Sequence, residues 1–138
     1  MLYAKKKIPL LFENETYKIN GILFEVHREI GRFAKEKQYA DLLEKKLKEK
    51  DIPFKRELRV GDTGNIFDFL IGGNIIVELK AKPFLTKQDY FQLKTYLQSV
   101  NLKLGLLVNF RSEYLKPQRV LHPQAISSVD ISGSVTNP

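Results

Sequence analysis

The sequence predicts an α/β domain of three layers, in which helices flank a central mixed sheet of about four or five strands and one extra helix precedes this core. Three observations predict it. Two segments with helical periodicity come first, three short strand-like segments follow, and a last helix leads into a further apolar strand. With 138 residues, 43% of them hydrophobic, the chain suits a single domain with one core.

Two amphipathic helices are predicted in the first third of the chain. Residues 15–30 repeat apolar side chains at intervals of three and four, which is the period of a helix with one buried face. These side chains are Ile19, Ile22, Leu23, Val26 and Ile30. Gly31 can end this helix as a left-handed C-cap. A second helix is expected over residues 36–50, and Pro53 prevents its continuation because proline cannot extend the hydrogen-bond ladder.

A β-hairpin is predicted near the middle of the chain. Residues 66–71 and 75–81 flank Gly72-Gly73-Asn74, and these turn residues accept the positive φ that a tight hairpin requires. Both strands are apolar on both faces, which is typical of a sheet covered on two sides. A shorter strand over residues 54–60 precedes the hairpin. Its apolar side chains are expected on one face: Phe54, Leu58 and Val60.

The last predicted elements are a helix and one or two strands. Thr86 can cap the helix, with Asp89 as the reciprocal partner of a capping box. A strand over residues 104–110 follows this helix, which suggests a crossover to a parallel neighbour. Residues 119–121 are expected to form a short strand or coil. The sequence thus predicts a domain over residues 15–121, between an N-terminal arm (1–14) and a flexible tail (122–138) rich in small and polar residues.

Composition narrows the function. The net charge of +7, from 23 basic and 16 acidic residues, favours a polyanionic partner, nucleic acid first. The chain has no cysteine, which excludes a disulfide framework and a thiolate zinc site. No run approaches the roughly 20 apolar residues of a membrane span. We therefore expect a soluble, cytoplasmic protein with no membrane partner.

Three charged residues lie within the apolar hairpin. Glu78 and Lys80 are two apart on one strand, so they point the same way, and Asp68 lies on the partner strand. Burying such charges costs several kcal/mol unless they are paired or bind a metal. Carboxylate oxygens suit Mg²⁺ or Mn²⁺, which can polarise a phosphate and activate water, while a lysine orients that water or neutralises charge. Phosphodiester hydrolysis would explain the set; an ordinary ion pair at the hairpin end is the structural alternative.

The ordered set of motifs resembles the PD-(D/E)XK nuclease superfamily, and more narrowly the small bacterial GxxExxR proteins assigned to it. The matching pieces are Gly21…Glu25-Val26-His27, Phe67-Asp68-Phe69-Leu70, Ile76-Val77-Glu78-Leu79-Lys80-Ala81, Gln92-Leu93…Tyr96-Leu97 and Leu104-Gly105-Leu106-Leu107-Val108-Asn109-Phe110. The resemblance covers roughly residues 17–121 and implies a restriction-endonuclease-like core.

The resemblance also implies a metal site. Asp68 and Glu78 would bind the ion together with the backbone carbonyl of Leu79, and Lys80 would be the catalytic lysine. An acid early in the helix before the first strand completes the site in related nucleases, and Glu36 has that place. The alternative for Glu36 is a solvated glutamate favoured by the helix dipole.

Two further pairs match the family. Gln92 and Tyr96 share a helix face and resemble the Gln-x-x-x-Tyr motif of RecB-type nucleases, whose residues lie beside the site and the nucleic acid; alternatively, Tyr96 is a core residue and Gln92 a surface one. Glu25 and His27 lie on the extra first helix. His27 could act as a ligand or base, but a role in helix packing is the favoured interpretation.

These observations predict a Mg²⁺- or Mn²⁺-dependent nuclease that acts on DNA rather than RNA, in repair, recombination or defence, with a homodimer as one allowed assembly. One alternative is a catalytically silent nuclease-fold module for nucleic-acid binding or assembly. Another is an α/β domain whose strand charges are merely paired with each other.

Overall fold

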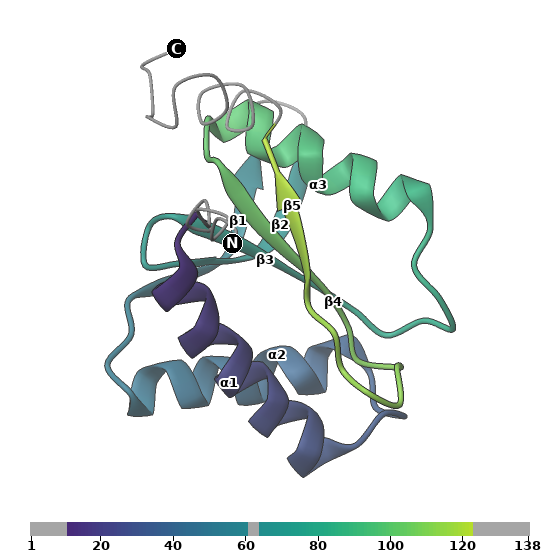
Figure 1. Ribbon diagram of the computed structural model, residues 1–138. Coiled ribbons are helices and arrows are strands. Elements are labelled where there is room, and N and C mark those ends of the chain that lie inside the picture. Colours follow the sequence, from purple (N-terminus) through teal and green to yellow (C-terminus); the bar gives the residue numbers. More distant parts are fainter. Residues whose placement is uncertain (1–10, 61–63, 123–138) are drawn as a thin grey trace, which may run out of the picture.

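The computed structural model describes residues 11–60 and 64–122, and Figure 1 shows their arrangement. Its helices are α1 (Glu13–Ile30), α2 (Glu36–Glu49) and α3 (Lys87–Val100), and its strands are β1 (Phe54–Val60), β2 (Asn65–Ile71), β3 (Ile75–Lys80), β4 (Leu104–Asn109) and β5 (Gln118–Leu121). The predicted elements are confirmed, with ends shifted by two residues at most. No helix of this described part is long and apolar enough to cross a membrane.

The two ends of the predicted domain differ slightly from expectation. Most of the predicted arm and tail, residues 1–10 and 123–138, lies outside the described residues. Within the described part, α1 begins at Glu13, two residues inside the predicted arm. His122, assigned to the tail, is buried, and its backbone N–H donates to the carbonyl of Lys103 at 2.9 Å. It therefore packs with the domain.

The five strands form one mixed sheet in the order β1-β2-β3-β4-β5. β3 and β4 run parallel, and the other neighbours are antiparallel. The predicted hairpin turn is confirmed, with positive φ at Gly72 (64°) and Gly73 (76°). The expected parallel crossover is also confirmed, since α3 connects β3 to β4.

The helices cover both faces of the sheet, as the three-layer prediction requires. α1 and α2 lie together on one face and α3 lies on the other (Figure 1). On the first face the rings of Tyr39 and Phe110 stack with centroids 4.2 Å apart. On the second face α3 approaches β4 closely at Gly105, where an added Cβ would lie 2.9 Å from the side chain of Leu93. A glycine is needed there to let the helix pack.

The prediction for the faces of β1 is wrong. Phe54 packs into the core under α1 and α2, whereas Leu58 packs into the core under α3; the side chain of Val60 lies outside the described part. Between them Glu57 has a φ of 58°, a left-handed conformation that is uncommon for a non-glycine residue and breaks the alternation of the strand. The pairs Arg56–Phe69 and Leu58–Phe67 on either side place Glu57 at the level of Asp68, so the irregularity lies beside the candidate site.

Candidate active site

The carboxylates of Asp68 and Glu78 meet where β2 and β3 separate. The backbone ladder between these strands ends at the pair Phe69–Val77. At the next position the N–H of Asp68 donates to Oε1 of Glu78 at 2.7 Å, and the N–H of Leu79 donates to Oδ2 of Asp68 at 2.7 Å. Each carboxylate thus takes the place of a backbone acceptor. We call this arrangement the carboxylate fork: Asp68, Glu78 and Leu79.

A cavity of about 290 Å³ opens beside the fork. It is lined from three sides, by α2, β1 and the β2–β3 pair: Glu36, Lys37, Ala40, Arg56, Glu57, Asp68 and Leu79. Glu36 is the first residue of α2 and is exposed, so it lies at the mouth of this cavity. Glu78 is only 5% exposed and lies behind Asp68. The structure therefore brings Glu36 to the same cavity as Asp68.

The two fork carboxylates resist ionisation. Burial raises the pKa of Glu78 to about 8, and the charge of Asp68 adds to this effect. Burial also raises the pKa of Asp68; the hydrogen bond from Leu79 N–H opposes the shift, and the charge of Glu36 adds to it. Lys80 opposes both shifts. The positive charge nearby is too small to stabilise both carboxylates in their ionised form. A bound cation would supply the missing positive charge.

The donor set fits a hydrated Mg²⁺ or Mn²⁺. Among residues 11–60 and 64–122, no three His, Asp or Glu side chains gather closely enough to chelate an ion. Mg²⁺, however, is usually held by one or two carboxylates and keeps several waters, with substrate phosphate completing its shell. Asp68, Leu79 and Glu36 line this cavity, and Glu78 is joined to Asp68 through the carboxylate fork. Together they provide an oxygen-rich site and no soft ligand.

Lys80 lies on the α3 side of the sheet, held between two residues of that helix. Its Nζ donates to Oε1 of Gln92 at 3.4 Å and is 3.9 Å from Oδ1 of Asp89. Asp89 is 7% exposed and also accepts from Thr86 N–H and from Lys82 Nζ at 2.9 Å. Sequence reasoning found Asp89 only as a capping residue. Its contacts with Lys80 and Lys82 arise from the packing of α3 against the sheet. The capping-box motif does not reveal this packing.

Tyr96 is both a core residue and a neighbour of the fork. It is 2% exposed, and its hydroxyl donates to the carbonyl of Ile66 at 3.4 Å. Burial raises its pKa, and the charges of Glu78 and Asp68 add to the shift, while a hydrogen bond with Gln92 opposes it. The two interpretations of Tyr96 are therefore compatible. Its ring packs in the core on the α3 side, and its hydroxyl is close enough to Asp68 and Glu78 for their charges to raise its pKa.

Arg56 is a cavity residue that sequence reasoning missed. It lies on β1 opposite Phe69, with its guanidinium carbon 5.6 Å from that ring centroid. Its Nη1 donates at 2.9 Å to both Asp41 and Glu44 of α2. Its positive charge opposes the rise in the pKa of Asp68. No sequence signal identified it, because its position depends on the register of β1 against β2.

Glu25 and His27 do not reach the cavity. Glu25 forms ion pairs with Lys46 of α2 and with Lys50, the residue after α2, at 3.5 and 3.8 Å. Nε2 of His27 lies 2.9 Å from the carbonyl oxygen of Ser112, in the connection between β4 and β5. These contacts join α1 to its neighbours, which is the packing role favoured for His27.

Comparison with known proteins identifies the family. A model of the PD-(D/E)XK nuclease superfamily matches residues 13–120. No curated protein and no solved structure matches the chain. The family match runs from the first residue of α1 into β5 and so includes strands β1 to β4 and the carboxylate fork. The chain therefore belongs to the PD-(D/E)XK nuclease superfamily and carries a nuclease fold.

Proposed function

We propose that this protein is a nuclease that uses Mg²⁺ or Mn²⁺ to hydrolyse phosphodiester bonds of DNA. The observation that carries the proposal is the pair of half-buried Asp68 and buried Glu78, whose carboxyl pKa values are raised and which lies in a fork of the sheet near Lys80. Structural ion pairs are normally satisfied by their partners, whereas this pair carries more negative than positive charge. Such perturbed groups next to a cavity are typical of functional sites.

Each site residue has a separate role in this proposal. Asp68 and Glu78 would hold the ion, with Glu36 and the carbonyl of Leu79 as further oxygen donors. The ion would polarise the scissile phosphate and make a bound water more acidic. Lys80 would orient or deprotonate that water and neutralise charge that develops on the phosphate.

Gln92 and Tyr96 would act beside the site rather than on the reacting atoms. Gln92 holds the ammonium of Lys80 in place through its amide oxygen, at 3.4 Å. Tyr96 is buried behind the fork, where its hydroxyl is anchored to β2. Both are therefore positioning residues of the lysine and the carboxylates.

The choice of substrate rests on charge and on resemblance. A net charge of +7 suits a polyanion, and the resemblance to DNA-cutting nucleases favours DNA. Repair, recombination and defence are all compatible with such an activity. A homodimer is one assembly that would enlarge the DNA-binding surface.

A second candidate is a nuclease-fold module that binds nucleic acid or assembles with partners and does not cut. Two observations favour it. Both fork carboxylates already accept backbone hydrogen bonds. The described residues also hold no cluster of three metal-binding side chains. This candidate predicts that nucleic-acid binding is unchanged by EDTA and that calorimetric titration with Mn²⁺ gives no binding heat.

A cleavage assay on plasmid and labelled oligonucleotide DNA tests the proposal. The wild type should cut with Mg²⁺ or Mn²⁺ and not with EDTA. Lys80→Ala and Asp68→Asn should each lower the rate by about 100-fold or more, while Lys94→Ala, an exposed lysine of α3, should cut normally. Equal rates for Lys80→Ala and the wild type would exclude the role of Lys80. No cutting at all, with EDTA-insensitive binding, would favour the second candidate.

A further inference from the structure

An exposed aromatic ring in the connection that precedes α2 lies close to two arginines. Phe33 is 76% exposed. The guanidinium carbon of Arg32 is 4.8 Å from its ring centroid, and that of Arg111 is 5.7 Å away. None of the roles given above uses these three residues, which we call the stacking surface: Arg32, Phe33 and Arg111.

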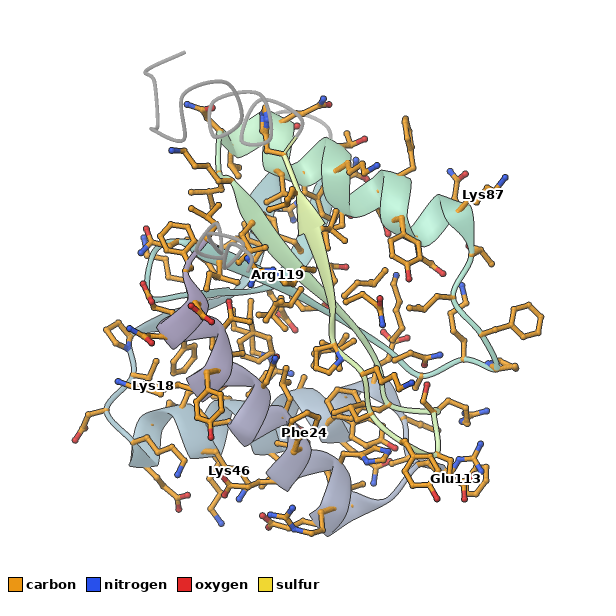
Figure 2. The ribbon with its side chains drawn as sticks, in the orientation of Figure 1. Lys18, Phe24, Lys46, Lys87, Glu113 and Arg119 are labelled. Carbon is orange, nitrogen blue, oxygen red and sulfur yellow. The ribbon has the colours of Figure 1, made fainter. Side chains whose placement is uncertain are left out.

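Hydrogen bonds from arginine side chains to backbone carbonyls of distant residues hold the stacking surface in place. Nε of Arg32 donates to the carbonyl of Arg111 at 2.8 Å, and Nε of Arg111 donates to the carbonyl of Arg32 at 3.1 Å. Nη2 of Arg111 also donates to the carbonyl of Ala81 at 3.5 Å. Figure 1 shows the α1–α2 and β4–β5 connections side by side, and Figure 2 shows Glu113 of the second connection there. A surface fixed in this way loses little conformational freedom when it binds a ligand.

The charge of this surface is not neutralised by neighbouring acids. Within the described residues, neither Arg32 nor Arg111 forms an ion pair with an aspartate or glutamate. Arg56, by contrast, has two carboxylate partners. Two guanidinium groups without acidic partners favour an anionic ligand, and their fork of donors matches a phosphate.

The stacking surface lies next to the candidate active site. Phe33 is three residues before Glu36, so their Cα atoms are at most about 11 Å apart. Ala81, which accepts from Arg111, directly follows Lys80. A DNA strand advances about 3.4 Å per nucleotide, so a ligand on Phe33 would lie within about three nucleotides of the cavity.

We infer that the stacking surface binds a single-stranded segment of nucleic acid, with an unpaired base stacked on Phe33 and the flanking phosphates bound by Arg32 and Arg111. A base inside a duplex already has neighbours on both faces, so an exposed ring can stack only on an unpaired base or an end. Stacking of this kind is tolerant of sequence. The inference rests on the proposed function, because it takes nucleic acid as the partner. It narrows the substrate class from DNA in general to DNA with an unpaired strand.

Fluorescence anisotropy in EDTA tests the inference without cleavage. Wild-type protein, Phe33→Ala, Phe33→Leu and Phe33→Trp are titrated into a labelled single-stranded oligonucleotide and into a labelled long duplex, whose ends are few relative to its internal binding sites. Phe33→Ala and Phe33→Leu should weaken single-strand binding about tenfold or more and change duplex binding less than about twofold. Phe33→Trp should keep or restore affinity, because tryptophan retains a flat aromatic face.

A matched control is available on the far part of α1. Tyr17 is 81% exposed and precedes Lys18, which Figure 2 places away from Glu113, toward the other end of α1. Tyr17→Ala should leave single-strand binding unchanged. Because both aromatic side chains are exposed, neither substitution to alanine should change the thermal unfolding temperature appreciably.

The results separate this inference from the proposed function. Unchanged single-strand binding in Phe33→Ala, an equal loss on both oligonucleotides, or full affinity in Phe33→Leu would each overturn the inference. So would a wild type that binds neither oligonucleotide. Metal-dependent cleavage that persists in any of these cases would leave the proposed function standing. Phe33-dependent single-strand binding without any metal-dependent cleavage would instead reject the nuclease and keep the stacking surface.

Discussion

Replacing Glu78 with glutamine tests the electrostatic description of the fork. The folded-state pKa of Glu78, about 8, lies above the ordinary glutamate value of 4.5 because the side chain is buried. The folded protein therefore keeps a proton that the unfolded chain releases. The stability that follows from this is fully present below about pH 4.5 and is lost as the pH rises toward 8. Glutamine stays neutral, and its Oε1 can still accept the N–H of Asp68, as Oε1 of Glu78 does.

The size of the effect follows from the width of that pH window. Between the two pKa values the wild type should lose about 1.4 kcal/mol of unfolding free energy per pH unit from this residue, or about 2–3 kcal/mol from pH 5 to pH 7. Glu78→Gln should lack this loss, so it should become increasingly more stable than the wild type as the pH rises. A gain in stability at the expense of function is common when an active-site charge is removed.

Urea denaturation in EDTA at several pH values between 5 and 8 measures the effect. Glu113→Gln is the matched control, because Glu113 is an exposed glutamate in the β4–β5 connection. It should follow the pH dependence of the wild type. Parallel curves for Glu78→Gln and the wild type would refute the argument, since they would mean that Glu78 ionises as readily in the folded protein as in the unfolded chain.

Three further predictions concern metal binding at the fork and packing at two other places in the fold. Saturating Mg²⁺ at pH 8 should raise the thermal unfolding temperature of the wild type but not of Asp68→Asn, because a ligand stabilises only the form that binds it; scanning calorimetry measures the shift. Gly105→Ala should destabilise the protein by about 1–3 kcal/mol in urea denaturation, because the new Cβ meets Leu93 at 2.9 Å. His27→Ala should cost about 1 kcal/mol by losing its contact with Ser112, and it should leave cleavage unchanged; a large loss of rate would place His27 in the site.

The elements of this fold are predictable because their signals are local. Gly72 and Gly73 alone specify a tight turn, and both adopt positive φ. Thr86 and Asp89 form the expected capping box at the start of α3. Periodicity alone also identified the buried face of α1. Signals of this kind involve neighbours within four residues, so they can be recognised in the sequence without knowledge of the tertiary structure.

The features that escaped prediction depend on the strand register or on distant contacts. Alternation failed in β1 because Glu57 adopts a left-handed conformation, and no residue pattern there requires it. Arg56 reaches the cavity only through the register of β1 on β2. The contact of Arg32 with Arg111 spans 79 residues. Propensity and spacing carry no information about such pairs.

The fork itself explains how a weak motif can make a specific site. The sequence predicted Asp68 and Glu78 on the two partner strands of a hairpin, and in the structure each carboxylate accepts a backbone N–H of the opposite strand. These bonds use Oδ2 of Asp68 and Oε1 of Glu78, and a carboxylate has a second oxygen with lone pairs of its own. The fork can therefore stay intact while the remaining oxygens bind a cation. Since a neutral side chain at position 78 could hold the fork equally well, an ionisable glutamate at this position is better explained by a ligand than by the architecture of the sheet.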